Sequence, residues 1–123
     1  MLKKTITYKD YSGLERKEDF YFNLSKSEIT EMELSIEGGL QNKMERLISE
    51  QNGGEIIRVI KDIILRSYGQ KSEDGRRFIK GEEISKAFSE TPAYDQLFMS
   101  LVTDAEEAAN FIKGIVPEDL SGK

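Results

Sequence analysis

The stretch that decides the fold is "EIIRVIKDIILRSY", residues 55–68. Its apolar residues cover most of a helical circumference, and only four charged residues mark a polar side: Arg58, Lys61, Asp62 and Arg66. A helix that is apolar nearly all round is buried in a protein core. We therefore expect a central helix over residues 55–68, with Gly69 as the residue that ends it.

Three more helices are predicted after this one. Residues 82–89 form a short amphipathic segment, and Thr91-Pro92 is typical of a helix start, with Thr as N-cap and Pro in the first turn. Apolar residues then recur at helical spacing from Tyr94 to Val102. Thr103 and Glu106 have the spacing of a capping box for a last helix, which Pro117 ends.

The chain before the central helix begins with two strands. "LKKTITYK" and "EDFYFNL", residues 2–9 and 18–24, alternate apolar and polar residues, which indicates half-buried strands. Residues 10–13 supply a turn in which Gly13 is free to take a positive φ. The pattern predicts an antiparallel hairpin.

Two helices should connect this hairpin to the central helix. Ser25 and Glu28 form a capping box for the first. The second is expected over about Leu40 to Glu50, and the Asn-Gly-Gly sequence at residues 52–54 stops it. The fold class is therefore α+β, a single domain over residues 1–123. It divides into a hairpin (1–24), a bundle of five or six short helices (25–116) and a frayed tail (117–123).

The loop "SYGQKSEDGRRFIKG", residues 67–81, is the main candidate for chemistry. As a calcium loop it lacks the acidic residue needed at its last position, and as a phosphate loop it lacks the GxxxxGK[ST] spacing. Its bases, Lys71, Arg76, Arg77 and Lys80, suit nucleic acid, but acidic residues interrupt them. We interpret the Asp74-Gly75 dipeptide as the turn of a short hairpin or ordered connection.

Composition excludes several classes of function. The chain has no Cys and no His, which removes thiolate chemistry, the usual general base and the commonest metal ligand. The paired carboxylates Glu82/Glu83 and Glu106/Glu107 are adjacent in helices, do not face each other, and are best explained as solvated faces. The net charge of −5 disfavours general nucleic-acid binding, and no apolar run is long enough to span a membrane. We expect no enzyme, no metal, no cofactor and an unexported protein.

The strand edges of the hairpin leave one question open. Unpaired strand edges can accept a strand from another protein, or helices and Lys side chains can protect them. The sequence does not decide between these outcomes.

Three segments resemble a known family: "TITYKDYSGLERKEDFYFNLSKSEITEMELS" (5–35), "IIRVIKDIILRSYGQKSEDGRRFIK" (56–80) and "AFSETPAYDQLFMSLVTDAEEAANFIKGIVP" (87–117). In their order and in their general residue pattern, these segments resemble the small tail assembly chaperones of long-tailed bacteriophages and prophages of Gram-positive bacteria. The resemblance covers nearly the whole chain and includes no catalytic motif.

The resemblance implies a non-enzymatic protein that binds and solubilises the tape measure protein in the host bacterial cytoplasm and is absent from the mature virion. It also implies the major tail tube protein as a further partner, and we add a homo-oligomer as another. The residues of this chain that are candidates to contact the client are Met44, Leu47, Arg76, Arg77, Phe88, Leu97, Phe98 and Met99. The alternatives are a phage or prophage protein that modulates a host defence or regulatory protein, and a nucleic-acid-binding accessory protein.

Overall fold

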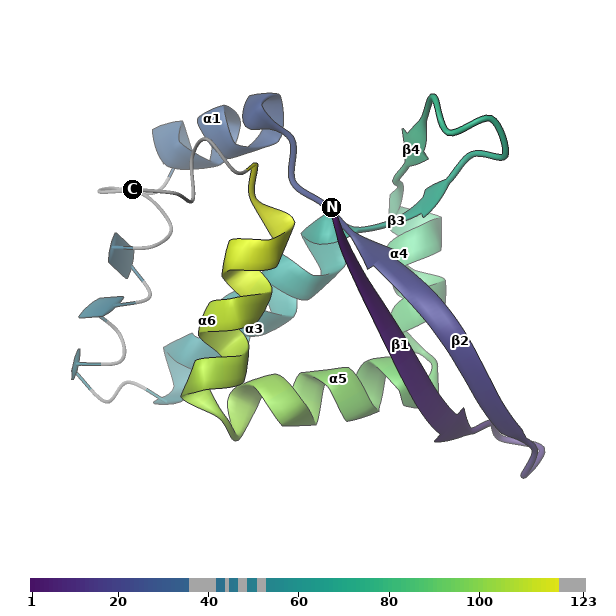
Figure 1. Cartoon of the computed structure of the whole chain (residues 1–123). Helices are drawn as coiled ribbons and strands as arrows, with labels where there is room; N and C mark the ends of the chain where they lie inside the picture. Colours follow the sequence, from purple (N-terminus) through teal and green to yellow (C-terminus); the bar gives the residue numbers. More distant parts are fainter. Residues whose placement is uncertain (36–41, 44, 47–48, 51–52, 118–123) are drawn as a thin grey trace.

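The computed structural model describes residues 1–35, 42–43, 45–46, 49–50 and 53–117. Its elements are β1 (Leu2–Lys9), β2 (Glu15–Phe22), α1 (Lys26–Ser35), α3 (Gly53–Ser67), β3 (Tyr68–Lys71), β4 (Phe78–Ile79), α4 (Glu82–Ser89), α5 (Pro92–Val102) and α6 (Ala105–Ile115). The predicted α+β class, with an N-terminal hairpin followed by helices, is confirmed (Figure 1). The predicted helix over 40–50 lies largely outside the described residues, of which 42–43, 45–46 and 49 are helical. The predicted frayed tail beyond Pro117 also lies outside them.

The first hairpin forms as predicted, but its second strand covers Glu15–Phe22 and not residues 18–24. β1 and β2 pair antiparallel over their whole length, from Leu2 opposite Phe22 to Lys9 opposite Glu15. The Oδ1 atom of Asp10 accepts the backbone N–H groups of Ser12 and Leu14, each at 2.9 Å, and Gly13 has a φ of 84°. The side chain of Asp10 and the freedom of glycine together close the turn.

The end of the central helix differs from the prediction. α3 stops at Ser67, and Tyr68 starts β3, which pairs antiparallel with β2 on one side and with β4 on the other. The two hairpins therefore form one sheet in the order β1-β2-β3-β4. The expected helix-ending role of Gly69 is wrong, because Gly69 is a strand residue opposite Tyr21 and its φ is not positive.

Gly69 is needed in the strand for a different reason. A Cβ atom at this position would lie 2.6 Å from Cε2 of Phe78 and 2.9 Å from the carbonyl oxygen of Ile79. Both distances are shorter than van der Waals contact, so only glycine lets β4 approach β3 this closely.

The core lies where the sheet meets the helices. Phe22 of β2 is completely buried, and its ring centroid lies 5.2 Å from that of Phe111 in α6 and 5.8 Å from that of Phe88 in α4. Phe88 in turn stacks on Tyr68 at 4.2 Å. α3 adds four buried aliphatic side chains: Val59, Ile60, Ile63 and Ile64. The predicted burial of this helix is confirmed for one face only, because Ile57 of the same helix is 45% exposed. The ring cluster joins the sheet to α4 and α6.

Helix α5 contacts four of the other elements. It packs against α3, α4, α6 and β1, and Figure 1 shows it running beneath the other helices. Thr91 caps it as predicted, accepting the N–H of Tyr94 at 3.2 Å. The capping box predicted for α6 is wrong, because the N-cap is Asp104, whose carboxylate accepts the N–H of Glu106 at 3.0 Å. Thr103 is the C-cap of α5 instead. A carboxylate is a favourable N-cap, since its charge complements the helix dipole.

Candidate partner-binding site

The β3–β4 loop, residues 72–77, is an ordered turn in which neighbouring residues of the loop donate hydrogen bonds to the carboxylate of Asp74. The carboxylate of Asp74 accepts the hydroxyl of Ser72 at 2.7 Å and the backbone N–H of Arg76 at 3.0 Å. These hydrogen bonds, that of Arg76 first, lower the pKa of Asp74. Gly75 has a φ of 75°, and the N–H of Arg77 is donated to the Ser72 hydroxyl at 3.0 Å. The interpretation as a short hairpin turn is confirmed.

This turn presents two basic side chains to solvent. Arg76 and Arg77 are exposed, and neither makes an ion pair in the part of the chain that the structure describes. Figure 1 shows the loop projecting from the body of the protein at the upper right, away from the turn of the first hairpin. Two unpaired guanidinium groups on a rigid turn are well placed to meet carboxylates of a partner.

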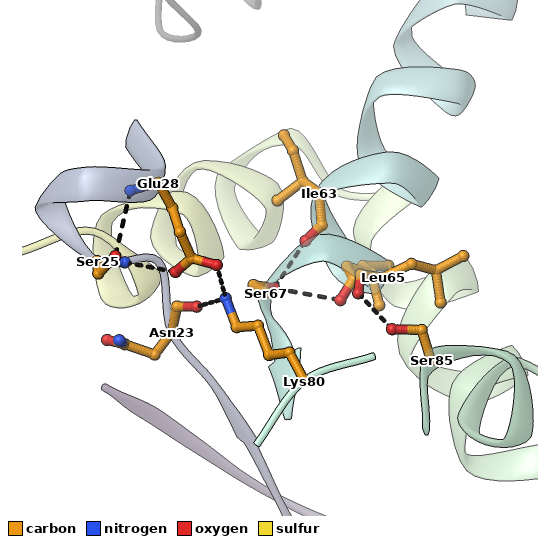
Figure 2. Close-up of polar contacts among 9 residues, drawn as sticks. Asn23, Ser25, Glu28, Ile63, Leu65, Ser67, Lys80 and Ser85 are labelled. Carbon is orange, nitrogen blue, oxygen red and sulfur yellow. Dashed lines mark hydrogen bonds and ion pairs between the residues drawn. The ribbon is translucent and has the colours of Figure 1, made fainter. Parts of the chain in front are cut away.

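Lys80, which the sequence placed among the basic residues of the same loop, has a structural role. Its ammonium group donates to the carbonyl oxygen of Asn23 and to Glu28, each at 2.6 Å (Figure 2). Glu28 also closes the predicted capping box, accepting the N–H of Ser25 at 2.8 Å and donating its own to the Ser25 hydroxyl at 3.2 Å. Burial raises the pKa of Glu28, but the hydrogen bonds from Lys80 and Ser25 outweigh it, and the net pKa is lowered.

The base of the second hairpin is fixed in the same region. The hydroxyl of Ser67, which is buried at the end of α3, donates to the carbonyl oxygen of Ile63 at 2.7 Å, and the hydroxyl of Ser85 in α4 donates to that of Leu65 at 2.9 Å (Figure 2). These bonds satisfy the polar groups where α3 turns into β3. The hairpin is therefore anchored at its base by Lys80, Ser67 and Ser85.

The candidate contacts on the helices have different degrees of exposure. Phe88 and Leu97 are only 3% and 5% exposed and belong to the core, so in this fold they offer no surface to a partner. Phe98 is half-buried and stacks on Tyr94, whereas Met99 is 49% exposed. The predicted contacts Met44 and Leu47 lie outside the described residues. Met99, Phe98 and the two loop arginines thus remain as predicted contacts.

A cleft that the sequence did not reveal opens between β2 and β3. It is an open hollow of about 500 Å³, lined by residues 18–21 of β2 and residues 68–71 of β3. We call it the β2–β3 cleft. It exists because β3 pairs with β2 only at Gly69 and Tyr68 and then departs from it to pair with β4. No local sequence signal shows this, because the cleft depends on how far two distant strands stay paired.

The cleft has a mixed aromatic and charged lining. Phe20 and Tyr68 lie with their ring centroids 6.5 Å apart, and the ammonium group of Lys71 lies 5.1 Å from the ring centroid of Tyr21. Burial raises the pKa of the Tyr68 hydroxyl, which keeps it neutral at physiological pH. Such a lining offers apolar contact, backbone groups, one cation and the carboxylates of Glu18 and Asp19.

The described residues contain no group of acidic side chains arranged to hold a metal ion. Within the same residues, no helix is both long and apolar enough to cross a membrane.

Comparison with known proteins identifies the family. No curated protein and no solved structure matches the chain. A family model described as phage tail assembly chaperone matches residues 1–123, which is the whole chain. The resemblance seen in the sequence is thereby confirmed. On this match, the chain belongs to the phage tail assembly chaperone family.

Proposed function

We propose that this chain binds the phage tape measure protein and keeps it soluble while the tail is assembled. The observation that carries the proposal is the family match over the whole length of the chain. A tail assembly chaperone acts on phage tail proteins in the host cell, and it is generally not an enzyme. We further propose that it works in the host bacterial cytoplasm and is absent from the finished virion.

The surface of the protein supports a role in binding. Among the described residues, five large apolar side chains are exposed: Met1, Tyr11, Leu14, Ile57 and Met99. Ile57 and Met99 belong to α3 and α5, which pack against each other. The exposed arginines of the β3–β4 loop add a polar contact for a client with acidic residues. Apolar contact combined with charge is a common way to bind an amphipathic helix.

Co-expression with the tape measure protein of the same phage tests the proposal. We expect the tape measure protein to move from the insoluble to the soluble fraction and to be retained by a tag on this chain. A tape measure protein that stays insoluble and is not retained contradicts the proposal. If the tag instead retains one host protein reproducibly, the alternative of a host-protein modulator replaces it.

Two charge-reversal variants locate the contact. In Arg76→Glu with Arg77→Glu, both arginines of the exposed turn become acidic, and we expect weaker retention at an unchanged melting temperature. The matched control, Lys61→Glu with Lys113→Glu, makes the same change of charge at exposed positions of α3 and α6. Equal loss of retention in both pairs shows an effect of net charge and removes the loop from the contact.

A further inference from the structure

Strand β2 has one edge that is paired only in part. Toward β1 it pairs over all eight residues, whereas toward β3 it pairs only at Tyr21 and Phe22. Within the described residues, no strand covers residues 15–20 of β2 on this side. We call residues 15–19 on this side the open edge of β2. The β2–β3 cleft lies at its inner end, where residues 18–21 form one wall.

The hydrogen bonds show which backbone groups point toward the open edge. The N–H of Asn23, directly after β2, is donated to the carbonyl oxygen of Ser67, directly before β3, at 2.8 Å. Because backbone groups alternate sides along a strand, the odd-numbered residues of β2 point toward β3 and the even-numbered residues point toward β1. The residues whose N–H and C=O groups face the open edge are therefore Glu15, Lys17 and Asp19. The matching partner for such a row of backbone groups is another strand.

The outer edge of the sheet at β1 is treated differently. The side-chain amide of Gln96 in α5 donates to the carbonyl oxygen of Thr7 at 3.0 Å, and β1 packs against α5 and α6. Lys4 of β1 also lies 3.8 Å from Glu107 of α6. The helices thus cover the edge of β1, whereas the edge of β2 is left open.

The side chains of the open edge alternate between the two faces of the sheet. Arg16 and Glu18 lie on the same face as Phe20, and their charged groups are 3.9 Å apart. Arg16 also pairs with Asp10 at 2.6 Å, and Glu18 accepts the hydroxyl of Tyr8. The charges on this inner face therefore satisfy one another.

The outer face of the edge carries charges in the order acidic, basic, acidic. These residues are Glu15, Lys17 and Asp19. Lys9 of β1 is paired with Glu15 in the strand register, yet neither Glu15 nor Lys17 makes an ion pair in the part of the chain that the structure describes. Asp19 differs from them, because it accepts the hydroxyl of Thr5 at 2.6 Å. The outer face thus leaves one acidic and one basic side chain without an ionic partner.

These charges decide which strand fits the edge. Opposite charges directly across two strands stabilise their pairing, and like charges destabilise it. An acidic residue is therefore favoured opposite Lys17 and a basic residue opposite Glu15. The place opposite Asp19 favours an uncharged polar residue, because Lys71 lines the same cleft. On the inner face, a satisfied ion pair and the ring of Phe20 favour apolar residues.

A partner of a single charge sign fits less well. A segment with only acidic residues would meet Glu15 and Asp19 as like charges, and a segment with only basic residues would meet Lys17 and Lys71. The open edge holds three acidic and two basic residues, which also disfavours an oligonucleotide. The alternation of charge, and not its sum, distinguishes the matching strand.

We propose that the open edge of β2 is a strand-addition site for an extended segment of a partner protein in which charges of alternating sign are separated by apolar residues. The segment pairs with the backbone groups of the edge. It places an acidic residue opposite Lys17, a basic residue opposite Glu15 and an uncharged polar residue opposite Asp19. Its apolar residues lie on the side of Phe20. The site does not depend on the identity of the tape measure protein as client, so either proposal can fail alone.

Two dye-labelled peptides with blocked ends test the charge pattern on the full-length protein. The probe is Ser-Thr-Val-Glu-Val-Lys-Ser, and the control is Ser-Thr-Val-Lys-Val-Glu-Ser, which has the same composition and the same net charge of zero. In either strand direction the control sets like charges opposite Lys17 and its acidic neighbour. We expect the probe to bind about fivefold or more tightly in fluorescence anisotropy. Equal binding of the two peptides, or tighter binding of the control, overturns the proposal.

A charge swap in the protein should reverse this preference. Glu15→Lys with Lys17→Glu leaves the net charge unchanged and alters two exposed side chains without ion pairs among the described residues. We expect the variant to keep the melting temperature of the wild type and to bind the control peptide more tightly than the probe. A folded variant that keeps the wild-type preference shows that the peptide binds elsewhere.

Methylated peptides test the backbone pairing and need no protein variant. In the paired segment, the N–H of the glutamate opposite Lys17 donates to β2, and the N–H of the preceding valine points away. We expect N-methylation of the glutamate to weaken binding by about tenfold or more, and N-methylation of that valine by about threefold or less. Equal losses for the two methylated peptides overturn strand addition.

Hydrogen exchange in the wild-type protein locates the pairing. We expect the amides of Lys17 and Asp19 to exchange rapidly in the free protein and slowly with the probe peptide bound. The amides of Arg16 and Glu18, which face β1, should exchange slowly in both states. Amides of Lys17 and Asp19 that are slow without peptide, or that stay fast with saturating peptide, refute the proposal.

Discussion

Replacing Gly69 with alanine is the sharpest test of how the two hairpins join. The new methyl group would lie 2.6 Å from one carbon of the Phe78 ring, 2.9 Å from another and 2.9 Å from the carbonyl oxygen of Ile79. The ring can rotate away, but the oxygen belongs to the backbone of β4, so the strand itself must move. The substitution therefore strains the pairing of β3 with β4.

The size of the effect follows from two opposing contributions. Overpacking costs about 1–3 kcal/mol, and a collision with backbone belongs in the upper half of that range. Alanine also restricts the unfolded chain, which offsets about 0.4–1 kcal/mol. We expect Gly69→Ala to lower the free energy of unfolding by about 2 kcal/mol, which moves the urea midpoint down by about 1 M when the m-value is about 2 kcal/mol/M.

Urea denaturation followed by circular dichroism measures the effect, and the chain offers a matched control. Gly54 lies in the first turn of α3, and a Cβ atom there would have no neighbouring atom within 4 Å, so Gly54→Ala should stabilise the protein by about 0.5–1 kcal/mol. In a Phe78→Ala background, Gly69→Ala should cost about 1 kcal/mol less, because two of the three close contacts are gone. A midpoint for Gly69→Ala equal to or above that of the wild type would refute the described approach of β4 to β3.

Three further predictions concern the core, a cap and an ion pair. Ile60→Asp should unfold the domain, because a carboxylate at a position 4% exposed has no partner, and an unchanged melting temperature would place α3 outside the core. Asp104→Ala should cost about 1 kcal/mol in urea denaturation and Thr103→Ala less, and the reverse order would contradict the assigned cap of α6. For Glu28, the folded-state pKa is lowered, so its stabilisation is full above its ordinary pKa of 4.5 and is lost as pH falls through the folded value. The stability gap between wild type and Glu28→Gln should thus be larger at pH 7 than at pH 3, and a gap that widens in acid would contradict the ion pair with Lys80.

Much of the fold could be predicted from local patterns. The alternation in β1, the turn at Gly13, the capping box at Ser25 and the start of α5 at Thr91 all appear in the structure as predicted. Each depends on residues a few positions apart, whose spacing is visible in the sequence. The tail assembly chaperone family was also recognisable from the order of these segments.

The candidate site was harder to predict, because exposure and strand pairing are properties of the assembled fold. Phe88 and Leu97 are apolar, as contact residues often are. In the fold, however, both are buried in the hydrophobic core. Lys80 has the sequence context of a free base, yet it reaches Glu28, 52 positions earlier in the chain. Periodicity shows that a side chain is apolar or charged, and does not show what lies against it.

The sequence by itself determined the helices, the first hairpin and the absence of Cys and His chemistry, because these follow from residue type and short spacing. The tertiary structure alone decided that Tyr68 leaves the central helix to become a strand, that this strand joins β2 for two residue pairs, and that a cleft opens where it departs. The physical reason is that strand pairing joins residues far apart in the chain. The energy of that pairing overrides the helical pattern that continues through Tyr68.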